Sequence, residues 1–580
     1  MPSFFPTVLA VAATTLAITP IASGRYQASW SYTLDFAGFG DSLEDMAVDA
    51  DGSVVFTGQS ATAFGVFTED LVTVKLDADG NPLWSTRYDG PAGRADRGLG
   101  VALGADGSVY VTGQSDGGPS GLDIVTIRYS RDGVRQWVAR YSDPNDSLDR
   151  GTDIAVDANG RAFVTGYSLT ATGYHYTTLA YDAAGNQRWV AQHVSPDGVA
   201  RAIALDRAGN PIVTGSDGGR FGTVKYDAGT GEQLWVARYS AASLAEAFDL
   251  AVDDDDNVYV TGSSGTGYAG TLVDWATIKY DAAGQRQWLR RYDGPAGSID
   301  EPVALALDPS QTRLVVTGYS EGLGTSSDLT TISYDAATGD RQWTARLNGP
   351  ENGLDRAEDV VVDASGQAAV VGTWVVARGA VREQIALSYD DNGVETWRAT
   401  TGAPGSRSAH GRMLRLGGRG ASLYTGGLVD NDYGVQRFDA AGAYEAFGAG
   451  CAGTIGTPVL SASTTPALGT PLDLVVAPAA PSRPSFGIVG ASRTSLGAVS
   501  LPVALGPAGA PGCTLFVSLD VVVPLPPAPG GPATPWRLLI PGDPALLCQQ
   551  LFLQVVVPDD VNPLGVITSN AGQITVGVSP

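Results

Sequence analysis

The sequence has few residues that supply metal-binding or nucleophilic chemistry. Its only histidines are His175, His193 and His410, and no two of them have the spacing of a zinc site. It contains no glycine-rich phosphate loop and no nucleophile elbow in a strand–turn–helix context. Without a catalytic constellation, the sequence favours a binding or structural role over an enzymatic one.

Basic residues are also scarce. The chain has 36 lysines and arginines against 61 aspartates and glutamates, a net charge of −25 over 580 residues. So acidic a chain would repel phosphate backbones and anionic lipid, which argues against nucleic acid and membrane surfaces as partners. Hydrophobic residues still make up 43% of the chain, enough to bury a large core.

Residues 1–24 are expected to be an export signal. Residues 8–18 form an apolar run that is too short to span a bilayer, and small residues follow at 22–24. The segment before the run has no lysine or arginine, so a buried or disordered apolar N-terminus is the alternative. No other segment approaches the length of a membrane span. We therefore expect a protein that is secreted or lies on the surface of a bacterial cell.

What the sequence does contain is a repeat of about fifty residues. A glycine stands four residues before a tryptophan seven times, ending at Trp84, Trp137, Trp189, Trp235, Trp288, Trp343 and Trp397. Each unit reads as four short β-branched runs joined by turns such as Asp-Gly, without helical periodicity. A Thr-Gly pair, or Val-Gly in one unit, ends the second run eight times. The sequence therefore has eight units of a propeller or solenoid.

We predict an all-β fold with two domains. Residues 25–449 would form an eight-bladed β-propeller, with seven blades as the rival count. The eighth unit lacks its tryptophan, and residues 28–36 around Trp30 would supply the missing strand and seal the open edges. Residues 450–580 combine Pro-rich turns with alternating apolar runs, which predicts a small C-terminal β-sandwich.

All three cysteines lie in this C-terminal segment. Cys451 and Cys513 both follow a glycine at loop-like places, so we expect them to form a disulfide. Cys548 lies in an apolar run and is expected to be buried. The segment resembles the short Gly-Cys-led C-terminal modules of secreted proteins from planctomycete-like bacteria, whose role is unassigned.

The repeats resemble two known families. Residues 157–168 and the sequence Tyr-Asp-Gly-Pro-Ala-Gly at 292–297 resemble the SBBP repeats of bacterial β-propellers. The pattern of Asp335, Gly339 and Trp343 resembles the tryptophan-docking motif of quinoprotein-like eight-bladed propellers. The first resemblance implies a secreted or surface protein. The second family includes quinone-dependent dehydrogenases and assembly scaffolds, and only the scaffold is expected, since those dehydrogenases need a disulfide between adjacent cysteines to hold the quinone.

Ligand-binding residues are expected where the units differ, in the loops after the second strand of each unit. Trp275, Trp374, Phe67 and Tyr174 lie in or beside these loops and would stack on a sugar or anchor a protein partner. The alternative is that they pack the bases of the loops. A glycan-active hydrolase or lyase on the same face is the enzymatic alternative, and it would need convergent carboxylates, or Arg with Tyr.

Calcium is the one cofactor that the sequence leaves open. Asp253, Asp255 and Asn257 offer oxygen ligands in one turn, although the ligand order of a known calcium loop is missing and a solvated turn is preferred. A calcium-stabilised structural protein would repeat such turns around the ring. Our main expectation is a monomeric, non-catalytic propeller that acts as a binding or cell-surface scaffold for a protein or carbohydrate ligand.

Overall fold

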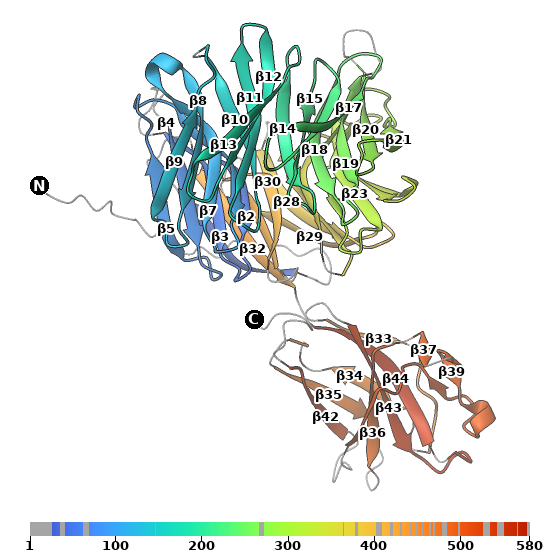
Figure 1. Ribbon diagram of the computed structural model, residues 1–580. Helices are drawn as coiled ribbons and strands as arrows, with labels where there is room; N and C mark the ends of the chain where they lie inside the picture. Colours follow the sequence, from blue (N-terminus) through green and yellow to red (C-terminus); the bar gives the residue numbers. More distant parts are fainter. Residues whose placement is uncertain are drawn as a thin grey trace, which may run out of the picture. The chain divides into compact units, whose positions relative to one another are not determined.

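The computed structural model divides into two units, one containing Ala28–Phe438 and one containing Asp439–Pro580 (Figure 1). The described residues are 26–34, 41–61, 69–265 except 146, 272–377 except 364, 381–401, 409–417, 422–429, 432–440, 443–447, and 449–576 apart from 455, 463, 465, 468–469, 478–483, 493, 497–498, 526–533, 542–549 and 565. Within these ranges the elements are strands and two short 3-10 turns, Gly118–Ser120 and Gly506–Ala508. The predicted all-β class is confirmed. No helix in the described part of the chain is long and apolar enough to cross a bilayer.

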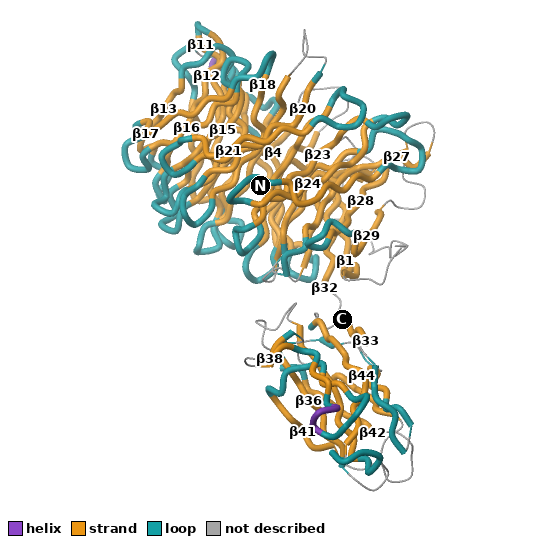
Figure 2. Tube along the Cα trace, turned by 90° about the vertical axis from the view of Figure 1, so that its right-hand side faces the viewer, coloured by secondary structure: helices purple, strands orange, loops and turns teal. Residues whose placement is uncertain are grey.

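The first unit is a β-propeller built from successive four-stranded antiparallel sheets, whose strands dominate the trace in Figure 2. The first four sheets are β2–β5 (Asp41–Val48, Val54–Ala61, Glu69–Leu76, Pro82–Tyr88), β6–β9 (Asp96–Leu103, Val109–Asp116, Leu122–Tyr129, Arg135–Tyr141), β10–β13 (Asp149–Val156, Ala162–Thr170, Gly173–Tyr181, Gln187–His193) and β14–β17 (Val199–Leu205, Pro211–Ser216, Phe221–Tyr226, Gln233–Tyr239). The next three are β18–β21 (Ala245–Val252, Val258–Gly265, Val273–Tyr280, Arg286–Tyr292), β22–β25 (Asp300–Leu307, Arg313–Glu321, Ser327–Asp335, Arg341–Leu347) and β26–β29 (Arg356–Val362, Ala368–Ala377, Val381–Tyr389, Glu395–Thr401).

The last sheet of this unit joins distant parts of the chain. It consists of β30 (Ala409–Gly417), β31 (Ser422–Val429), β32 (Asp432–Ala440) and, outermost, β1 (Tyr26–Leu34). With it, the described residues of this unit form eight four-stranded sheets, one for each sequence unit. β30 contacts both β26 and β2, and Figure 1 shows the orange β32 beside the blue β2 and β3. The N-terminal strand therefore closes the ring, at residues 26–34 instead of the expected 28–36.

The recurrent tryptophans connect neighbouring sheets. In five of them and in Trp30, the indole Nε1 donates to a carbonyl oxygen in the turn after the third strand of the next sheet, at 2.8–3.3 Å. The donor and acceptor pairs are Trp30–Ala78, Trp84–Arg131, Trp137–Ala183, Trp189–Ala228, Trp235–Ala282 and Trp288–Ala336. The glycine of that turn lies under the ring. Gly339 has φ +73°, and a Cβ there would lie 2.7 Å from Trp288, so the position requires glycine.

The second unit contains two larger sheets. One has the order β33 (Ala443–Phe447), β44 (Val566–Thr575), β43 (Gln550–Pro558), β36 (Ser485–Gly490), β41 (Val521–Leu525), and the other β34 (Val459–Ala462), β35 (Pro471–Ala477), β42 (Thr534–Leu539). Two short hairpins pair β37 (Ser495–Leu496) with β38 (Val499–Ser500), and β39 (Val503–Ala504) with β40 (Thr514–Leu515). Side chains from both larger sheets share one hydrophobic core.

The boundary between the units differs from the sequence expectation. The sequence predicts a propeller up to residue 449, whereas β33 pairs with β44 and the second unit begins at Asp439. The fourth strand of the last propeller sheet is β1, the strand that the sequence predicts around Trp30. Cys451 and Cys513, the pair favoured by the sequence, form a disulfide with Cα atoms 4.9 Å apart. Cys548 and the expected export signal lie outside the described residues.

Candidate functional site

Two of the aromatic residues proposed as ligand contacts are buried. Trp275, in β20, is fully buried, donates from Nε1 to the Tyr319 carbonyl at 3.2 Å and packs edge-on against Tyr292. Trp374, in β27, is 9% exposed and lies 5.4 Å from the Arg398 guanidinium. Both tryptophans pack the bases of the loops, which was the alternative interpretation. Neither presents a free ring to a ligand.

The other two aromatic candidates are placed differently. Tyr174, in β12, is half-buried and contacts Tyr167 edge-to-face, with ring centroids 5.5 Å apart. It remains a candidate ligand contact. Phe67 lies outside the described residues.

The proposed calcium turn uses its oxygens internally. The Oδ1 atom of Asp253 accepts hydrogen bonds from the amides of Asp255 and Asn257, at 3.0 and 2.8 Å. Its Oδ2 atom accepts from the Asn257 side chain and from the Tyr259 hydroxyl. Asp255 is exposed. Asp253 therefore organises the turn between β18 and β19, in the way that Asx turns do.

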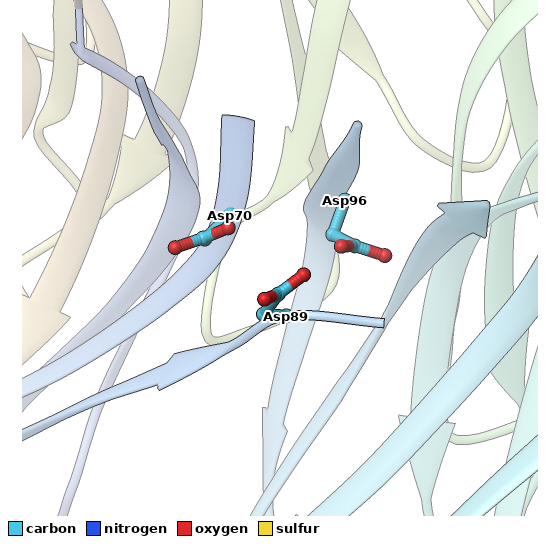
Figure 3. Close-up of side chains that lie close together, drawn as sticks. All are labelled: Asp70, Asp89 and Asp96. Carbon is cyan, nitrogen blue, oxygen red and sulfur yellow. The ribbon is translucent and has the colours of Figure 1, made fainter. Parts of the chain in front are cut away.

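Two other clusters of carboxylates are better placed to hold a cation. Asp70, Asp89 and Asp96 each offer one oxygen, and these oxygens lie within 4.8 Å of one another. In Figure 3 the Asp89 carboxylate lies between those of Asp70 and Asp96. The second cluster has the same geometry and consists of Asp274, Asp293 and Asp300. Clustered carboxylate oxygens are the ligands that calcium prefers.

The sequence explains why this cluster occurs twice. In both clusters the second aspartate, Asp89 or Asp293, belongs to the sequence Tyr-Asp-Gly-Pro-Ala-Gly. The third, Asp96 or Asp300, begins the strand that follows this sequence. Burial and the neighbouring Asp89 raise the pKa of Asp70 and Asp96, while Arg87, 3.2 Å from Asp70, opposes the shift in Asp70. A bound divalent cation would relieve this repulsion. The motif was noted in the sequence only as a family resemblance, without a metal role.

A third group of acids lines the innermost strands and was missed by the sequence analysis. The four aspartates occupy equivalent bulged positions in every second sheet: Asp45 in β2, Asp153 in β10, Asp249 in β18 and Asp359 in β26. Each accepts a hydrogen bond from a backbone amide in the following sheet, at 2.8–2.9 Å. The intervening sheets have Gly100, Ala202, Ala304 and Met413 at this position. A signal existed, because the aspartate recurs with a period of two units.

This acidic ring is only partly neutralised. Arg415 contacts Asp45 at 2.8 Å and Asp359 at 2.7 Å. Burial, followed by the charge of Asp45, raises the pKa of Asp153 to about 7. Burial also raises the pKa of Asp249, to about 6. Burial also raises the pKa of Asp45 and Asp359, and the charge of Arg415 opposes the shift in both. Every one of the four holds two sheets together, which makes the ring structural.

The loop face is the face of the propeller that bears the loops between second and third strands and the connections between sheets. A pocket of about 490 Å³ opens there beside β12, between the β9–β10 connection and the β11–β12 loop. It is lined by Tyr141, Asp143, Asn145, Thr172, His175 and Gln192, among others. Its volume is in the range of small-ligand sites.

The pocket lining combines an aromatic ring with directed polar groups. His175 is 5% exposed, and its Nε2 lies 3.0 Å from the Thr172 hydroxyl. Its Nδ1 has no hydrogen-bond partner among the described residues. Asp143 accepts a hydrogen bond from the Gln192 side chain at 3.0 Å. Burial and Asp143 raise the pKa of Tyr141 to about 12, which keeps it a neutral hydroxyl donor. Such a lining suits a ligand rich in hydroxyl or amide groups.

The fold and repeats define this chain as a repeat β-propeller, and comparisons agree with that class. Residues 136–170 match the family described as Beta-propeller repeat, and residues 220–419 match the family described as Outer membrane protein assembly factor BamB. The resemblance to SBBP-type and quinoprotein-like propellers is thereby confirmed.

The individual relatives are distant. An uncharacterized WD repeat-containing protein, L264, of Acanthamoeba polyphaga mimivirus is 22% identical over 230 residues, which cover 34% of this chain and 14% of that protein. Quinohemoprotein alcohol dehydrogenase from Comamonas testosteroni is 13% identical with a TM-score of 0.46, covering 72% of this chain and 76% of its own. Virginiamycin B lyase from Staphylococcus aureus is 12% identical with a TM-score of 0.37, covering 59% and 94%. The chain spans a small part of the curated relative that it matches, and no activity is transferred from these proteins.

Proposed function

We propose that this protein is a secreted, non-catalytic binding scaffold whose ligand, a glycan or a protein segment, docks on the loop face. The observation that carries this proposal is the pocket of about 490 Å³ beside β12, which Tyr141 and the buried His175 line. Trp30 and five of the recurrent tryptophans are occupied in connecting the sheets. Function on a propeller then falls to the parts of the units that vary. The partial match to an assembly-factor family supports a protein ligand as well as a glycan.

Binding to a glycan panel, measured by calorimetry on the full chain, tests this proposal. We expect one class of glycan or peptide to bind, and Asn145→Ala with Thr172→Ala to weaken binding about tenfold, since each removes a polar contact. Gln136→Ala is the matched control, because Gln136 is exposed in the adjacent β9 and does not line the pocket. Turnover of a bound glycan would replace this proposal with the hydrolase or lyase alternative. An affinity that is unchanged by both pocket substitutions would contradict the proposed binding site.

A calcium-stabilised structural role is the second candidate function. It rests on the repetition of one carboxylate triad at two sheet junctions, Asp70–Asp89–Asp96 and Asp274–Asp293–Asp300. Calcium at such positions would tie the connection between two sheets to the sheets themselves. The two functions are compatible, since the triads and the pocket use different residues. The calcium experiment is given in the Discussion.

A further inference from the structure

A second pocket on the loop face has the opposite charge from the protein as a whole. It has a volume of about 240 Å³ and lies where β26, β28 and β30 begin. Arg356, Arg382 and His410 line it, one from each of these strands. The chain has a net charge of −25, so three basic side chains around one pocket indicate a site for a negatively charged ligand.

The two arginines of this pocket form no ion pair with the described residues. Most arginines of the propeller are paired, as Arg346 is with Asp328 at 2.8 Å. Across the described residues, neither Arg356 nor Arg382 forms an ion pair. Glu358 lines the same pocket; burial raises its pKa, and the charges of Arg356 and Arg412 oppose that shift. The pocket thus presents unpaired positive charge.

Arg356 is held in a fixed orientation. Its guanidinium carbon lies 3.9 Å from the centre of the Tyr319 ring, which is stacking distance. The Tyr319 hydroxyl donates to Oε2 of Glu301 at 2.8 Å, and this bond fixes the ring in turn. Stacking uses the face of a guanidinium and leaves its N–H edge free. That edge is the part that binds a carboxylate through two parallel hydrogen bonds.

His410 completes the basic wall. Burial and the charges of Arg382 and Arg412 lower its pKa, so it is neutral near pH 7 and offers one N–H donor. No hydrogen bond or ion pair of its ring occurs among the described residues. An anion in the pocket would attract a proton to this ring.

The remaining lining consists of two hydroxyl residues, Glu358 and the apolar Leu354. The hydroxyl residues are Ser327 and Thr373, each 5% exposed, and Glu358 offers acceptor oxygens. Hydroxyl and carboxylate groups of this kind hydrogen-bond the hydroxyls of a sugar ring. A second acidic peptide group would instead be repelled by Glu358. The lining therefore matches one carboxylate on a body that carries hydroxyls.

We propose that this pocket binds a uronic acid unit of an acidic polysaccharide, with its carboxylate on Arg356 and Arg382. The inference rests on the proposed function and names the ligand class for the loop face. His410 and Glu358 would contact the sugar beside the carboxylate. The small volume suits a single sugar unit, so neighbouring units of the polysaccharide would extend over the loop face.

Calorimetry on the full chain tests the inference with digalacturonate as the acidic probe and its neutral counterpart, galactobiose. We expect the wild type to bind digalacturonate at least tenfold more tightly than galactobiose. Arg356→Gln and Arg382→Gln should each weaken digalacturonate binding by about tenfold or more. Arg94→Gln is the matched control: Arg94 is also on the loop face, is 69% exposed and does not line the pocket. It removes the same charge and should leave the affinity unchanged.

A second readout locates the ligand. The chain has only three histidines, so the ring signals of His410 can be separated by NMR from those of His175 and His193 with histidine variants. Digalacturonate should raise the pKa of His410, and galactobiose should not. The same NMR spectra show whether each arginine variant is folded, so a folding failure would not be mistaken for a lost contact.

The outcomes separate this inference from the proposed function. One outcome is that digalacturonate binds with an affinity that falls only in Asn145→Ala and Thr172→Ala. The loop face would then bind glycans, and the pocket of Arg356 and Arg382 would not be the uronate site. Preference for an acidic peptide over digalacturonate would overturn the inference and leave a protein-binding scaffold. If neither saccharide nor peptide binds, the inference and the proposed function both fail.

Discussion

The carboxylate of Asp153 accepts a hydrogen bond from the backbone amide of Ile203 in the following sheet, with 2.9 Å between Oδ2 and nitrogen. Its Oδ1 accepts from the amide of Ile154, which comes next in its own strand. One side chain therefore fixes the spacing of two sheets at the centre of the ring. Asp45, Asp249 and Asp359 repeat the arrangement.

The first prediction concerns the pH dependence of stability. Burial raises the pKa of Asp153 to about 7, whereas an aspartate in the unfolded chain titrates near pH 4. The folded state therefore holds this proton more tightly. The stabilising contribution is complete below about pH 4 and is lost as the pH rises through about 7. It amounts to at most about 4 kcal/mol, and to less because the neighbouring carboxylates titrate with it.

Asp153→Asn removes this titration and should gain stability relative to the wild type between about pH 5 and pH 8. Urea unfolding at several pH values measures the difference in free energy. Asp254→Asn is the control, since Asp254 is exposed and its carboxylate makes no hydrogen bond among the described residues. Parallel pH curves for the wild type and Asp153→Asn would show that Asp153 stays ionised throughout.

The second prediction compares two tryptophans of the same repeat position. Trp288→Phe removes the hydrogen bond from Nε1 to the Ala336 carbonyl and should cost about 1–2 kcal/mol in the free energy of unfolding. The Nε1 of Trp343 is buried without a hydrogen-bond partner among the described residues. Trp343→Phe removes an unsatisfied donor and should cost less or be neutral. Equal losses in the two variants would mean that ring packing, and not the hydrogen bond, dominates.

The third prediction concerns calcium. If the carboxylate triads bind calcium, the thermal midpoint should rise with calcium and fall with EDTA. At about a hundred times the dissociation constant the gain is roughly 2.7 kcal/mol per site. Asp89→Asn and Asp293→Asn should each remove part of the rise, and the double variant most of it. Asp79→Asn, an exposed turn residue outside both triads, should retain it. An identical thermal midpoint in calcium and in EDTA would show that neither triad binds calcium.

The fourth prediction concerns the disulfide between Cys451 and Cys513, which spans 62 residues. Opening a loop of that length should cost about 4 kcal/mol by the chain-entropy model. Replacing both cysteines by serine should lower the calorimetric transition of the second unit, and reductant should have the same effect on the wild type. The transition of the propeller should not move. A shift of both transitions would show that the two units unfold together.

The scaffold could be predicted from the sequence because its determinants recur in nearly every unit. The turn glycine and the tryptophan mark the third and fourth strands, and Trp30 identified the strand that closes the ring. The ligand residues could not be predicted in the same way. Trp275 and Trp374 occupy variable segments, but whether an aromatic ring is exposed or buried depends on the neighbouring sheet.

The acidic ring shows a different limit. Asp45 and Asp153 lie two units apart, and the unit between them has Gly100 at the same position. The recurring aspartate is therefore missed when each unit is compared with the next one. It is found when every second unit is compared. The basic pocket has no periodicity at all. Arg356, Arg382 and His410 come from three sheet strands, and only the folded chain brings them together.

The position of β1 in the last sheet has a consequence for synthesis. Its partner β32 ends at Ala440, so the strand made first must wait until some four hundred further residues have left the ribosome. Until then β1 has no partner strand, and exposed strand edges invite pairing with other chains. The entropy of closing so long a loop grows only slowly with its length. The risk of aggregation therefore comes from the time during which β1 is unpaired. Correct closure of the ring requires that the sheets made first stay soluble until β32 is synthesised, either alone or bound to a chaperone.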